Sequence, residues 1–388
     1  IKNGKTKQEV FEAIENYETD NGESMFKKPK DYELEDWYNL IQKNSKDGNY
    51  QTEGFEGAVV LDPKPGIYLN DPVSVLDYAS LYPSSIIEKN LSHETYVEDK
   101  DLIEEIGYGN LHKIEYENFL YQGKGKGDTV EKVINEEEPI KTCYFIKSEF
   151  MEKNNMGSKG IIPSVLEHLL QARSDTKKRM KKEPDEFKKK VLDGLQLAYK
   201  VTANSVYGQL GATTSTIFKM NLAACTTSIG RTRIDDASNG VKKWAQEEGY
   251  EEPDVIYGDT DSVFVKFSRK NKEGKLLEGK EALQHCIQCG EKAGKYITKE
   301  MLFKPQVLEY EKTFWPFILI SKKRYTGDKY EFDVNDCKRT SMGIVLKRRD
   351  NAPIVKYVFG NVIEKIMIDK NFELAISWLK DTLSRIKN

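Results

Sequence analysis

Residues 255–264 are Val-Ile-Tyr-Gly-Asp-Thr-Asp-Ser-Val-Phe, and residues 74–84 are Ser-Val-Leu-Asp-Tyr-Ala-Ser-Leu-Tyr-Pro-Ser. Both stretches are apolar runs that lead into carboxylates, Asp77 in one and Asp259 with Asp261 in the other. Such a pattern predicts buried strands that carry negative charge to a common site.

Asp259 and Asp261 stand two positions apart, so on an extended chain their side chains point the same way. An Asp-x-Asp alone is weak evidence in a chain this acidic, because most such pairs are solvated turn residues. Here apolar strand residues flank the pair on both sides, and Gly258 stands at the turn. The pattern therefore predicts a tight β-hairpin that carries both acids at its tip.

Three carboxylates that converge repel one another and are costly to desolvate unless a cation joins them. Oxygen ligands without neighbouring His or Cys favour magnesium or manganese over zinc. Magnesium held by a few carboxylates usually takes its remaining ligands from water and substrate phosphates. The acids therefore favour phosphoryl transfer as the chemistry of this chain.

Composition narrows the class of protein. The 388 residues, 38% of them hydrophobic, are enough for two or three packed units. No apolar run has membrane-spanning length and the N-terminus is no signal peptide, so we expect no membrane partner. The chain starts at Ile1 rather than Met, which indicates a processed product or a fragment.

The five cysteines are scattered, which indicates a reducing intracellular compartment. Cys286 and Cys289 form a Cys-x-x-Cys beside His285, but a zinc site needs further ligands and no second pair stands at a suitable spacing. Because residues 281–301 have helical periodicity, we interpret these three as helix residues without metal.

The net charge is only −3, but the charges are unevenly distributed. Residues 166–200 and residues 311–350 each contain 10 basic and 6 acidic residues, whereas residues 98–138 contain 5 basic and 12 acidic residues. Two basic segments beside one acidic insertion are typical of a nucleic-acid groove with a separate solvated face. Ordinary charged surface helices are the alternative.

Periodicity divides the chain into elements. We predict a strand over residues 55–61, a surface insertion over about 94–150, and a helical hairpin of residues 163–182 and 185–208 broken near Pro184. Further predicted elements are a helix over 223–244, a helix near 281–302, strands around 308–320, and two helices that end the chain.

Asp77 is followed closely by a predicted helix start. Pro83 suits the first turn of a helix, where its missing N–H costs nothing. Backbone N–H groups of Ser80, Leu81 and Tyr82 would then be free to hold an anion.

The predicted hairpin concentrates cations. Arg173 and Lys177 are four apart and share one helical face, while Lys200 and Asn204 share a face of the second helix. A guanidinium and ammonium groups on a stiff support suit a triphosphate. A solvated basic helix is the alternative, but Lys200 lies within the apolar run 197–201, where a lysine needs a partner.

Nucleic-acid contacts are predicted beyond the hairpin. Tyr207-Gly208 would offer an aromatic plane and open backbone to a base pair, unless Tyr207 is a core aromatic. Lys322-Lys323-Arg324-Tyr325 follows an apolar strand and suits backbone contacts, as does Lys347-Arg348-Arg349-Asp350. Short basic clusters are also common on surfaces generally.

Several of these motifs together resemble family B DNA polymerases. Asp77 to Ser84, Lys200 to Gly208 and Tyr257 to Ser262 are similar to the family's three polymerase motifs, in the family's order. The fourth, primer-contacting motif is similar to Lys322-Lys323-Arg324-Tyr325, and Phe55-Glu56-Gly57-Ala58 is similar to its linker motif, with Phe where Tyr is usual. Gly343 with Arg348-Arg349-Asp350 resembles the start of the thumb. The stretch Asn90 to Thr95 and the insertion resemble enzymes of large DNA viruses that infect eukaryotes.

The resemblance implies roles for individual residues. Asp77, Asp259 and Asp261 would be catalytic carboxylates that ligate two magnesium ions, with the Tyr78 carbonyl as a further ligand and manganese as a substitute metal. The residues implied to bind the nucleotide are Ser80, Leu81, Tyr82, Arg173, Lys177, Lys200 and Asn204, with Tyr82 excluding a 2′-hydroxyl. The residues implied to contact DNA are Tyr207, Gly208, Lys323, Arg324, Tyr325, Arg348 and Arg349.

The resemblance also implies an α+β fold of right-hand polymerase architecture. Its parts would be an N-terminal remnant or linker (1–53), an antiparallel palm sheet (54–160 and 213–335), helical-hairpin fingers (161–212) and a truncated helical thumb (336–388). The expected activity is template-directed addition of deoxynucleoside triphosphates to a primer. The expected partners are primer–template DNA and a sliding clamp or other processivity factor, in the host cytoplasm or nucleus.

Two alternatives remain for the activity. A non-catalytic nucleic-acid-binding relative would have no need of the costly acids Asp77, Asp259 and Asp261. A reverse transcriptase or RNA polymerase also uses such acids, but Tyr82 and the 200–208 motif favour a DNA polymerase. Only 76 residues precede Asp77, and none of them form the Asp-x-Glu pattern on a strand that the family's proofreading exonuclease needs, so we expect a catalytic fragment without that activity.

Overall fold

The computed structural model describes residues 49–124, 131–346 and 349–387. The predicted N-terminal segment up to residue 48 and two members of the basic cluster, Lys347 and Arg348, therefore lie outside the described residues. The chain divides into two compact units, the described parts of Ile1–Phe55 with Glu117–Lys141 and of Glu56–Tyr116 with Thr142–Asn388. The predicted insertion at 94–150 is thus divided between the two units.

The smaller unit is built on an antiparallel ribbon. β1 (Asn49–Phe55) pairs with the second half of β5 (Leu111–Lys124), and β6 (Glu131–Ile134) pairs with β5 residues 119–122. A cation–π contact between Lys132 and the Phe119 ring, 3.8 Å from ammonium to centroid, adds to this pairing.

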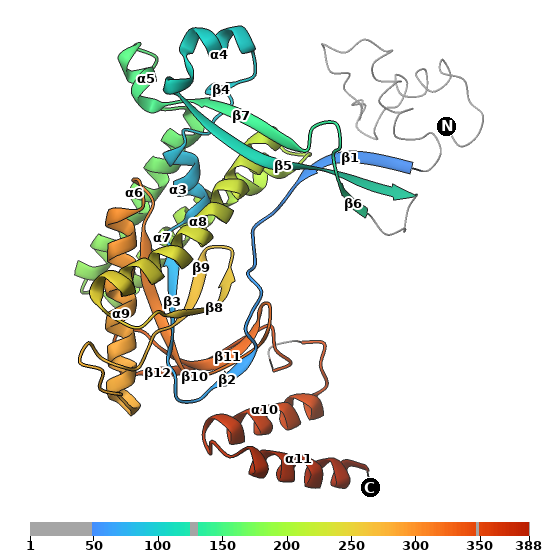
Figure 1. Cartoon of the computed structure of the whole chain (residues 1–388), viewed down its shortest axis with the longest axis vertical. Coiled ribbons are helices and arrows are strands. Elements are labelled where there is room, and N and C mark those ends of the chain that lie inside the picture. The colour runs from blue at the N-terminus through green and yellow to red at the C-terminus, as the bar shows by residue number, and fades with distance from the viewer. Residues whose placement is uncertain (1–48, 125–130, 347–348, 388) are drawn as a thin grey trace. The chain divides into compact units, whose positions relative to one another are not determined.

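The larger unit contains a seven-stranded antiparallel sheet in the order β12-β11-β10-β3-β9-β8, with β2 paired to β10 (Figure 1). Its strands are β2 Gly66–Tyr68, β3 Val73–Tyr78, β8 Asp254–Asp259, β9 Ser262–Lys266, β10 Leu308–Ser321, β11 Arg324–Tyr330 and β12 Cys337–Met342. Outside this sheet, β4 (Tyr96–Val97) pairs with β7 (Ile140–Ile146).

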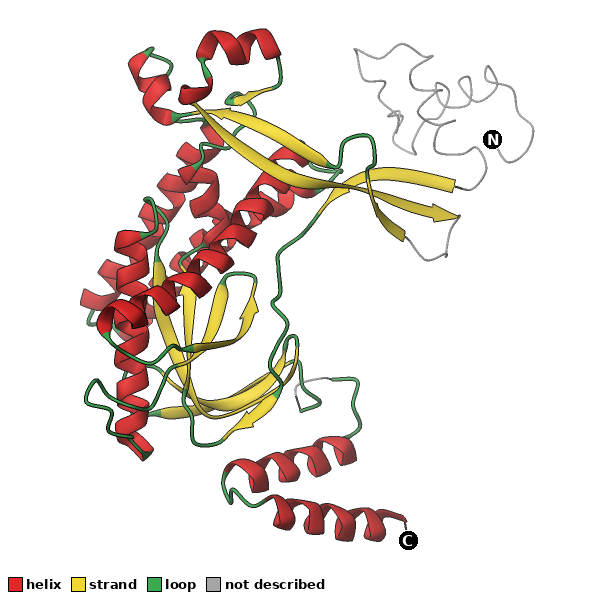
Figure 2. Ribbon diagram, viewed as in Figure 1, coloured by secondary structure: helices red, strands yellow, loops and turns green. Residues whose placement is uncertain are grey.

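Nine α-helices are described, drawn in red in Figure 2. They are α3 Leu81–Glu88, α4 Lys100–Ile106, α5 Ser148–Lys153, α6 Ile161–Lys182, α7 Glu186–Gly211, α8 Met220–Glu248, α9 Gly279–Glu300, α10 Pro353–Met367 and α11 Phe372–Lys387, with a 3₁₀ turn η1 at Tyr108–Asn110. Helices and antiparallel strands make this a mixed fold, and the α+β prediction is confirmed. In the described residues, no helix has the length and apolar content needed to cross a membrane.

The sheet is apolar on both faces, because its strands alternate between two core clusters. Leu76 and Val263 pack with residues of α8 and α9 on one face. Val75 and Phe264 pack on the other face among aromatic rings of β10 and β11. The alternation places the Tyr78 side chain on the α8 face and that of Asp77 on the opposite face.

The predicted helical hairpin is confirmed as α6 and α7. α7 begins after Asp185, whose carboxylate accepts hydrogen bonds from Phe187 N (2.8 Å) and Lys188 N (3.1 Å), and Pro184 disfavours continuation of α6. The N-terminus of α6 is capped from another segment, since Asn90 Oδ1 accepts from Gly160 N at 2.8 Å.

The strand predicted over 55–61 is wrong. β1 ends at Phe55, and residues 59–64 instead follow the edge of β8 through scattered bonds, such as Leu61 N to Gly258 O at 3.0 Å. Pro63 has no N–H to donate, so the bonding to β8 is interrupted between Leu61 N and Lys64 N, which donates to Ile256 O at 2.8 Å.

The insertion is more than a surface loop. Val97, Ile103, Leu111 and other apolar residues of its larger-unit part form a core cluster of their own. Tyr116 donates from its hydroxyl to Asn221 at the start of α8 (2.9 Å), so this segment also fixes that helix.

Candidate active site

The central strands of the sheet bring two acids together. β3 and β9 pair so that Asp77 lies opposite Ser262, and Tyr78 N donates to the carbonyl of Asp261 at 2.8 Å. Both acidic side chains are only partly exposed. Asp77 and Asp261 therefore lie at adjacent strand ends, as the two motifs predict.

The chain between Asp259 and Asp261 turns, although the sequence predicted that it would be extended there. β8 ends at Asp259, and Thr260 has a left-handed φ of 59°, with Asp261 N bonded to Asp259 O at 2.6 Å. The hairpin is confirmed, but Asp259 and Asp261 flank a reversal, so strand alternation does not align their side chains. Gly258 lies within β8, where a Cβ would meet the Leu61 side chain at 2.8 Å.

Burial and neighbouring carboxylates raise the pKa of both acids. Burial, followed by the charges of Asp261 and Glu311, raises the pKa of Asp77 to about 8, although Lys312 and Lys200 oppose the shift. Burial and the neighbouring Asp259 and Glu311 likewise raise the pKa of Asp261. Two desolvated carboxylates with oxygen donors only are a donor set that suits a hard divalent cation.

The side chain of Asp259 is bound by groups other than these two acids. One carboxylate oxygen accepts from Lys323 Nζ at 2.7 Å and the other accepts from the Tyr257 hydroxyl at 3.2 Å. Across residues 49–124, 131–346 and 349–387, no group of three or more His, Cys, Asp or Glu side chains has a geometry that could hold a metal ion. The predicted convergence of three carboxylates is therefore not seen, because Asp259 is drawn to Lys323.

Two further acids face the site, and motif spacing alone missed them. Glu309 on β10 lies opposite Asp77 in the β3–β10 register, and Glu311 raises the pKa of both Asp77 and Asp261. The alternation Leu308-Glu-Tyr-Glu is the signal that could have found them, since it places both acids on one strand face.

The hairpin helices contribute cations. Burial first, then the charges of Arg173 and Lys200, lowers the pKa of Lys177, while Glu309 opposes this shift. Arg173 also donates from Nε to Gln196 Oε1 across the hairpin at 3.3 Å. The three predicted cations therefore lie close to one another and to the acidic strands.

The prediction that Lys200 lies within a buried apolar run is wrong. Lys200 is exposed, and its apolar neighbours Leu197 and Val201 are themselves 51% and 59% exposed. The apolar run is a solvent-facing stretch of α7, not a core that would force Lys200 to find a partner. Asn204 is exposed on the same helix.

Two tyrosine rings pack together, tilted by 39°, beside the start of α3. Ser80 adopts a left-handed conformation (φ 56°) and begins the helix without a side-chain cap. The rings of Tyr82 and Tyr207 lie 4.4 Å apart between centroids, and Gly230 allows close packing, since a Cβ there would lie 3.2 Å from Tyr82 Cε1. Leu81 is buried, and Gly208 is exposed.

The predicted basic segment Lys322-Lys323-Arg324-Tyr325 is exposed at its lysines and arginine but buried at its tyrosine. Lys323 (φ 58°) and Arg324 are exposed, and Lys323 N donates to the Tyr257 hydroxyl at 2.8 Å. Tyr325, in contrast, is 5% exposed within the aromatic cluster of the sheet, so its predicted DNA contact is replaced by core packing. Arg349 is exposed.

Comparison with known proteins agrees with this arrangement. A family model described as DNA polymerase family B matches residues 31–388. The chain belongs to DNA polymerase family B. The predicted family is thereby confirmed.

Relatives of this family B chain include viral and cellular enzymes. It is 42% identical to the DNA polymerase of Pyramimonas orientalis virus, over 90% of this chain and 32% of that protein, which agrees with the predicted viral resemblance. It is 37% and 36% identical to the DNA polymerase delta catalytic subunits of Drosophila melanogaster and Schizosaccharomyces pombe, over 86% and 87% of this chain and 27% of each relative. The chain thus spans about a third or less of the length of these relatives.

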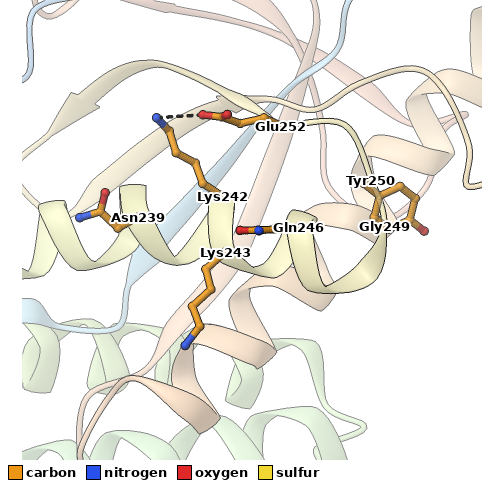
Figure 3. A pocket seen from close by; sticks show the side chains of 7 residues that line it. All are labelled: Asn239, Lys242, Lys243, Gln246, Gly249, Tyr250 and Glu252. Atoms are coloured by element: carbon orange, nitrogen blue, oxygen red, sulfur yellow. Dashed lines mark ion pairs between the residues drawn. The ribbon is translucent and has the colours of Figure 1, made fainter.

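A separate pocket of about 770 Å³ lies at the C-terminal end of α8 in this family B chain (Figure 3). Its seven lining residues are Asn239, Lys242, Lys243, Gln246, Gly249, Tyr250 and Glu252. Lys242 pairs with Glu252 at 3.2 Å, and Lys243 lies 3.9 Å from Glu247, so its cations are already matched by acids. None of the predicted site residues lines it.

Proposed function

We propose that this chain is the catalytic region of a DNA polymerase that adds deoxynucleoside triphosphates to a primer 3′-hydroxyl under the direction of a template. The observation that carries the proposal is the pair Asp77 and Asp261, two desolvated carboxylates held at adjacent strand ends of a family B chain.

Asp77 and Asp261 would hold two divalent cations, magnesium in the first place, with the Tyr78 carbonyl as a further ligand. When bound, such cations lower the pKa of the primer hydroxyl and neutralise charge on the pyrophosphate leaving group. Asp259 would join them once it leaves Lys323, whose ammonium is free to turn because it is exposed. Lys323 would then be available to the primer phosphates.

The triphosphate would be held mainly from the hairpin. Arg173, Lys177 and Lys200 form a cationic group near the acids, and Asn204 lies one turn beyond Lys200 on α7. A guanidinium fork and ammonium groups together match phosphate oxygens in geometry and charge. The backbone N–H groups at Ser80 and Leu81, at the start of α3, would bind phosphate oxygens from the other side.

Tyr82 would pack against the deoxyribose and exclude a 2′-hydroxyl, because Tyr207 and Gly230 confine its ring. Tyr207 and Gly208 would face the nascent base pair. The proposed phosphate contacts to DNA are Lys323, Arg324 and Arg349, with Arg348 completing the cluster outside the described residues. Tyr325 supports the turn at Lys323 from within the core.

In this proposal residues 54–160 and 213–335 form the palm, 161–212 the fingers, and 336–388 the start of the thumb. Primer–template DNA is the partner, and a sliding clamp or other processivity factor would join the full-length protein. The enzyme would act inside the cell, in the host cytoplasm or nucleus for a viral polymerase.

The test is primer extension with magnesium and a template of defined sequence. We expect incorporation of the complementary deoxynucleotide only, with loss of product when the metal is chelated and recovery when magnesium or manganese is restored. Extension that ignores the template, or that survives metal removal, would contradict the proposal.

A further inference from the structure

A nearly buried cluster of charges joins α3 to α8 behind the site. Arg233 Nη2 lies 2.8 Å and 2.9 Å from the two carboxylate oxygens of Glu88, and Arg233 Nη1 lies 2.7 Å from Asp236. The Arg233 and Glu88 side chains are only 10% and 3% exposed. Lys89 Nζ also contacts Glu88 at 2.9 Å.

Such a cluster is a poor source of stability. Burying charged groups costs desolvation energy, and apolar residues of similar volume often stabilise a fold as well or better. In addition, Arg233 Nε is buried without a hydrogen-bond partner. What the cluster supplies is geometry, because the planar guanidinium has its donors in fixed directions: Nη2 contacts both Glu88 oxygens while Nη1 is held by Asp236.

The residues that this cluster holds in place also contact the proposed active site. Gly230 lies three residues before Arg233 on α8, so both face α3. Gly230 leaves room for Tyr82 at the start of α3, since a Cβ there would lie 3.2 Å from Tyr82 Cε1, and Arg233 holds Glu88 at the end of α3. The hydroxyl of Tyr78, the residue that follows Asp77 on β3, donates to the Arg233 carbonyl at 2.7 Å.

We propose that the Glu88–Arg233 pair is a positioning element for sugar discrimination: it holds the short helix α3 so that the Tyr82 ring stays seated over Gly230. Glu88 and Arg233 do not touch the nucleotide and act through Tyr82. The inference rests on the proposed function, because it assumes that Tyr82 faces the deoxyribose.

The experiment compares kcat/KM for a deoxynucleotide and for the matching ribonucleotide in the full-length polymerase. This ratio does not depend on the fraction of folded enzyme, so a merely structural role would not move it. We expect Glu88→Gln to lower the ratio about tenfold, equivalent to about 1.4 kcal/mol, and Arg233→Lys, which keeps the charge but loses the fork, to lower it less. The double variant Glu88→Leu/Arg233→Met, which refills the volume, should fold and still lose discrimination.

Two controls separate the possibilities. Asp71→Asn breaks another partly buried pair (Arg269 Nε to Asp71, 2.7 Å) at the opposite end of β3 and should leave the ratio unchanged. In a Tyr82→Ala background, Glu88→Gln should have no further effect, because coupled residues are not additive.

An unchanged ratio in folded Glu88→Gln or in the double variant would overturn the positioning role, and so would an equal effect of Glu88→Gln with and without Tyr82. If Glu88→Gln does not fold, Arg233→Lys and the double variant decide by the same criterion. An unchanged ratio in Tyr82→Ala itself would instead overturn the sugar-contact part of the proposed function.

Discussion

The strand ends of the sheet supply acidic groups from a buried support, whereas the helical hairpin supplies basic groups from an exposed one. Asp77 and Asp261 are attached to strands whose neighbouring residues are fully buried, such as Leu76 and Val263. Lys200, in contrast, is exposed on α7, between apolar residues that are also exposed.

This difference follows from side-chain length and desolvation. A short Asp side chain can be placed only by its backbone, so a rigid and partly buried strand is needed to bring two of them together. Burial then strengthens their interaction with any cation, since the local dielectric is low. A lysine has a long flexible stem, so an exposed helix suffices to bring its charge to a phosphate.

The largest expected effect tests the sheet side of this comparison. Asp77→Asn or Asp261→Asn should lower kcat/KM for primer extension by about a thousandfold or more, because metal-assisted charge stabilisation is worth several kcal/mol. Primer–template affinity should stay near the wild-type value. Asp254→Asn, on β8 but paired with Lys64, is the matched control and should retain activity. Near-normal extension by either site variant would disprove the assignment.

The second prediction compares stability in the two regions. Leu76→Ala should lower the free energy of unfolding by about 2–5 kcal/mol, because it leaves a cavity between the sheet and its helices. Leu197→Ala, at a position 51% exposed on α7, should change it by less than about 0.5 kcal/mol. Urea denaturation of both variants measures the difference. Equal losses would show that the hairpin is packed in solution as tightly as the sheet.

The third prediction tests the hairpin side. Lys200→Ala should lower kcat/KM for the nucleotide about tenfold to a hundredfold, the range expected for a lost charged hydrogen bond. Duplex affinity should change little. Lys190→Ala, at another exposed position of α7, controls for the loss of one helix charge. A defect confined to duplex affinity would make Lys200 a groove residue.

The smallest effect concerns the dependence of stability on pH. Burial, followed by the charges of Lys89 and Lys147, lowers the pKa of His112 from 6.5 to about 4, against opposing shifts from Glu149 and Glu88. Because the folded state resists protonation, the contribution of neutral His112 is present above pH 6.5 and is lost as the pH falls from 6.5 towards 4.

His112→Gln should therefore flatten the loss of thermal stability over that interval. His168→Gln, at an exposed position of α6, should leave the pH profile unchanged. Identical profiles for His112→Gln and the wild type between pH 6.5 and 4 would contradict the predicted protonation.

Sequence periodicity predicted the long helices α6 to α9 well, because each has a pattern that does not depend on distant residues, whereas it did not predict the short helices α4 and α5 of the insertion. The break between α6 and α7 at Pro184 and Asp185 also depends only on the residues at that position. The strand predicted at 55–61 failed, since an apolar run shows only that a segment is buried and not whether it pairs regularly. The prediction that Lys200 is buried failed for a related reason, because the sequence does not show which side of α7 is covered by other residues.

The sequence by itself determined the chemical groups available to this protein: the acids Asp77, Asp259 and Asp261, the cations of the hairpin, and the family motifs that contain them. Only the tertiary structure decided which groups meet. The β3–β9 register brings Asp77 to Asp261, the reversal at Thr260 directs Asp259 to Lys323, and β10 adds Glu309 and Glu311. These contacts depend on pairing between segments far apart in the chain, where electrostatics and sterics act through space and leave no pattern in the local sequence.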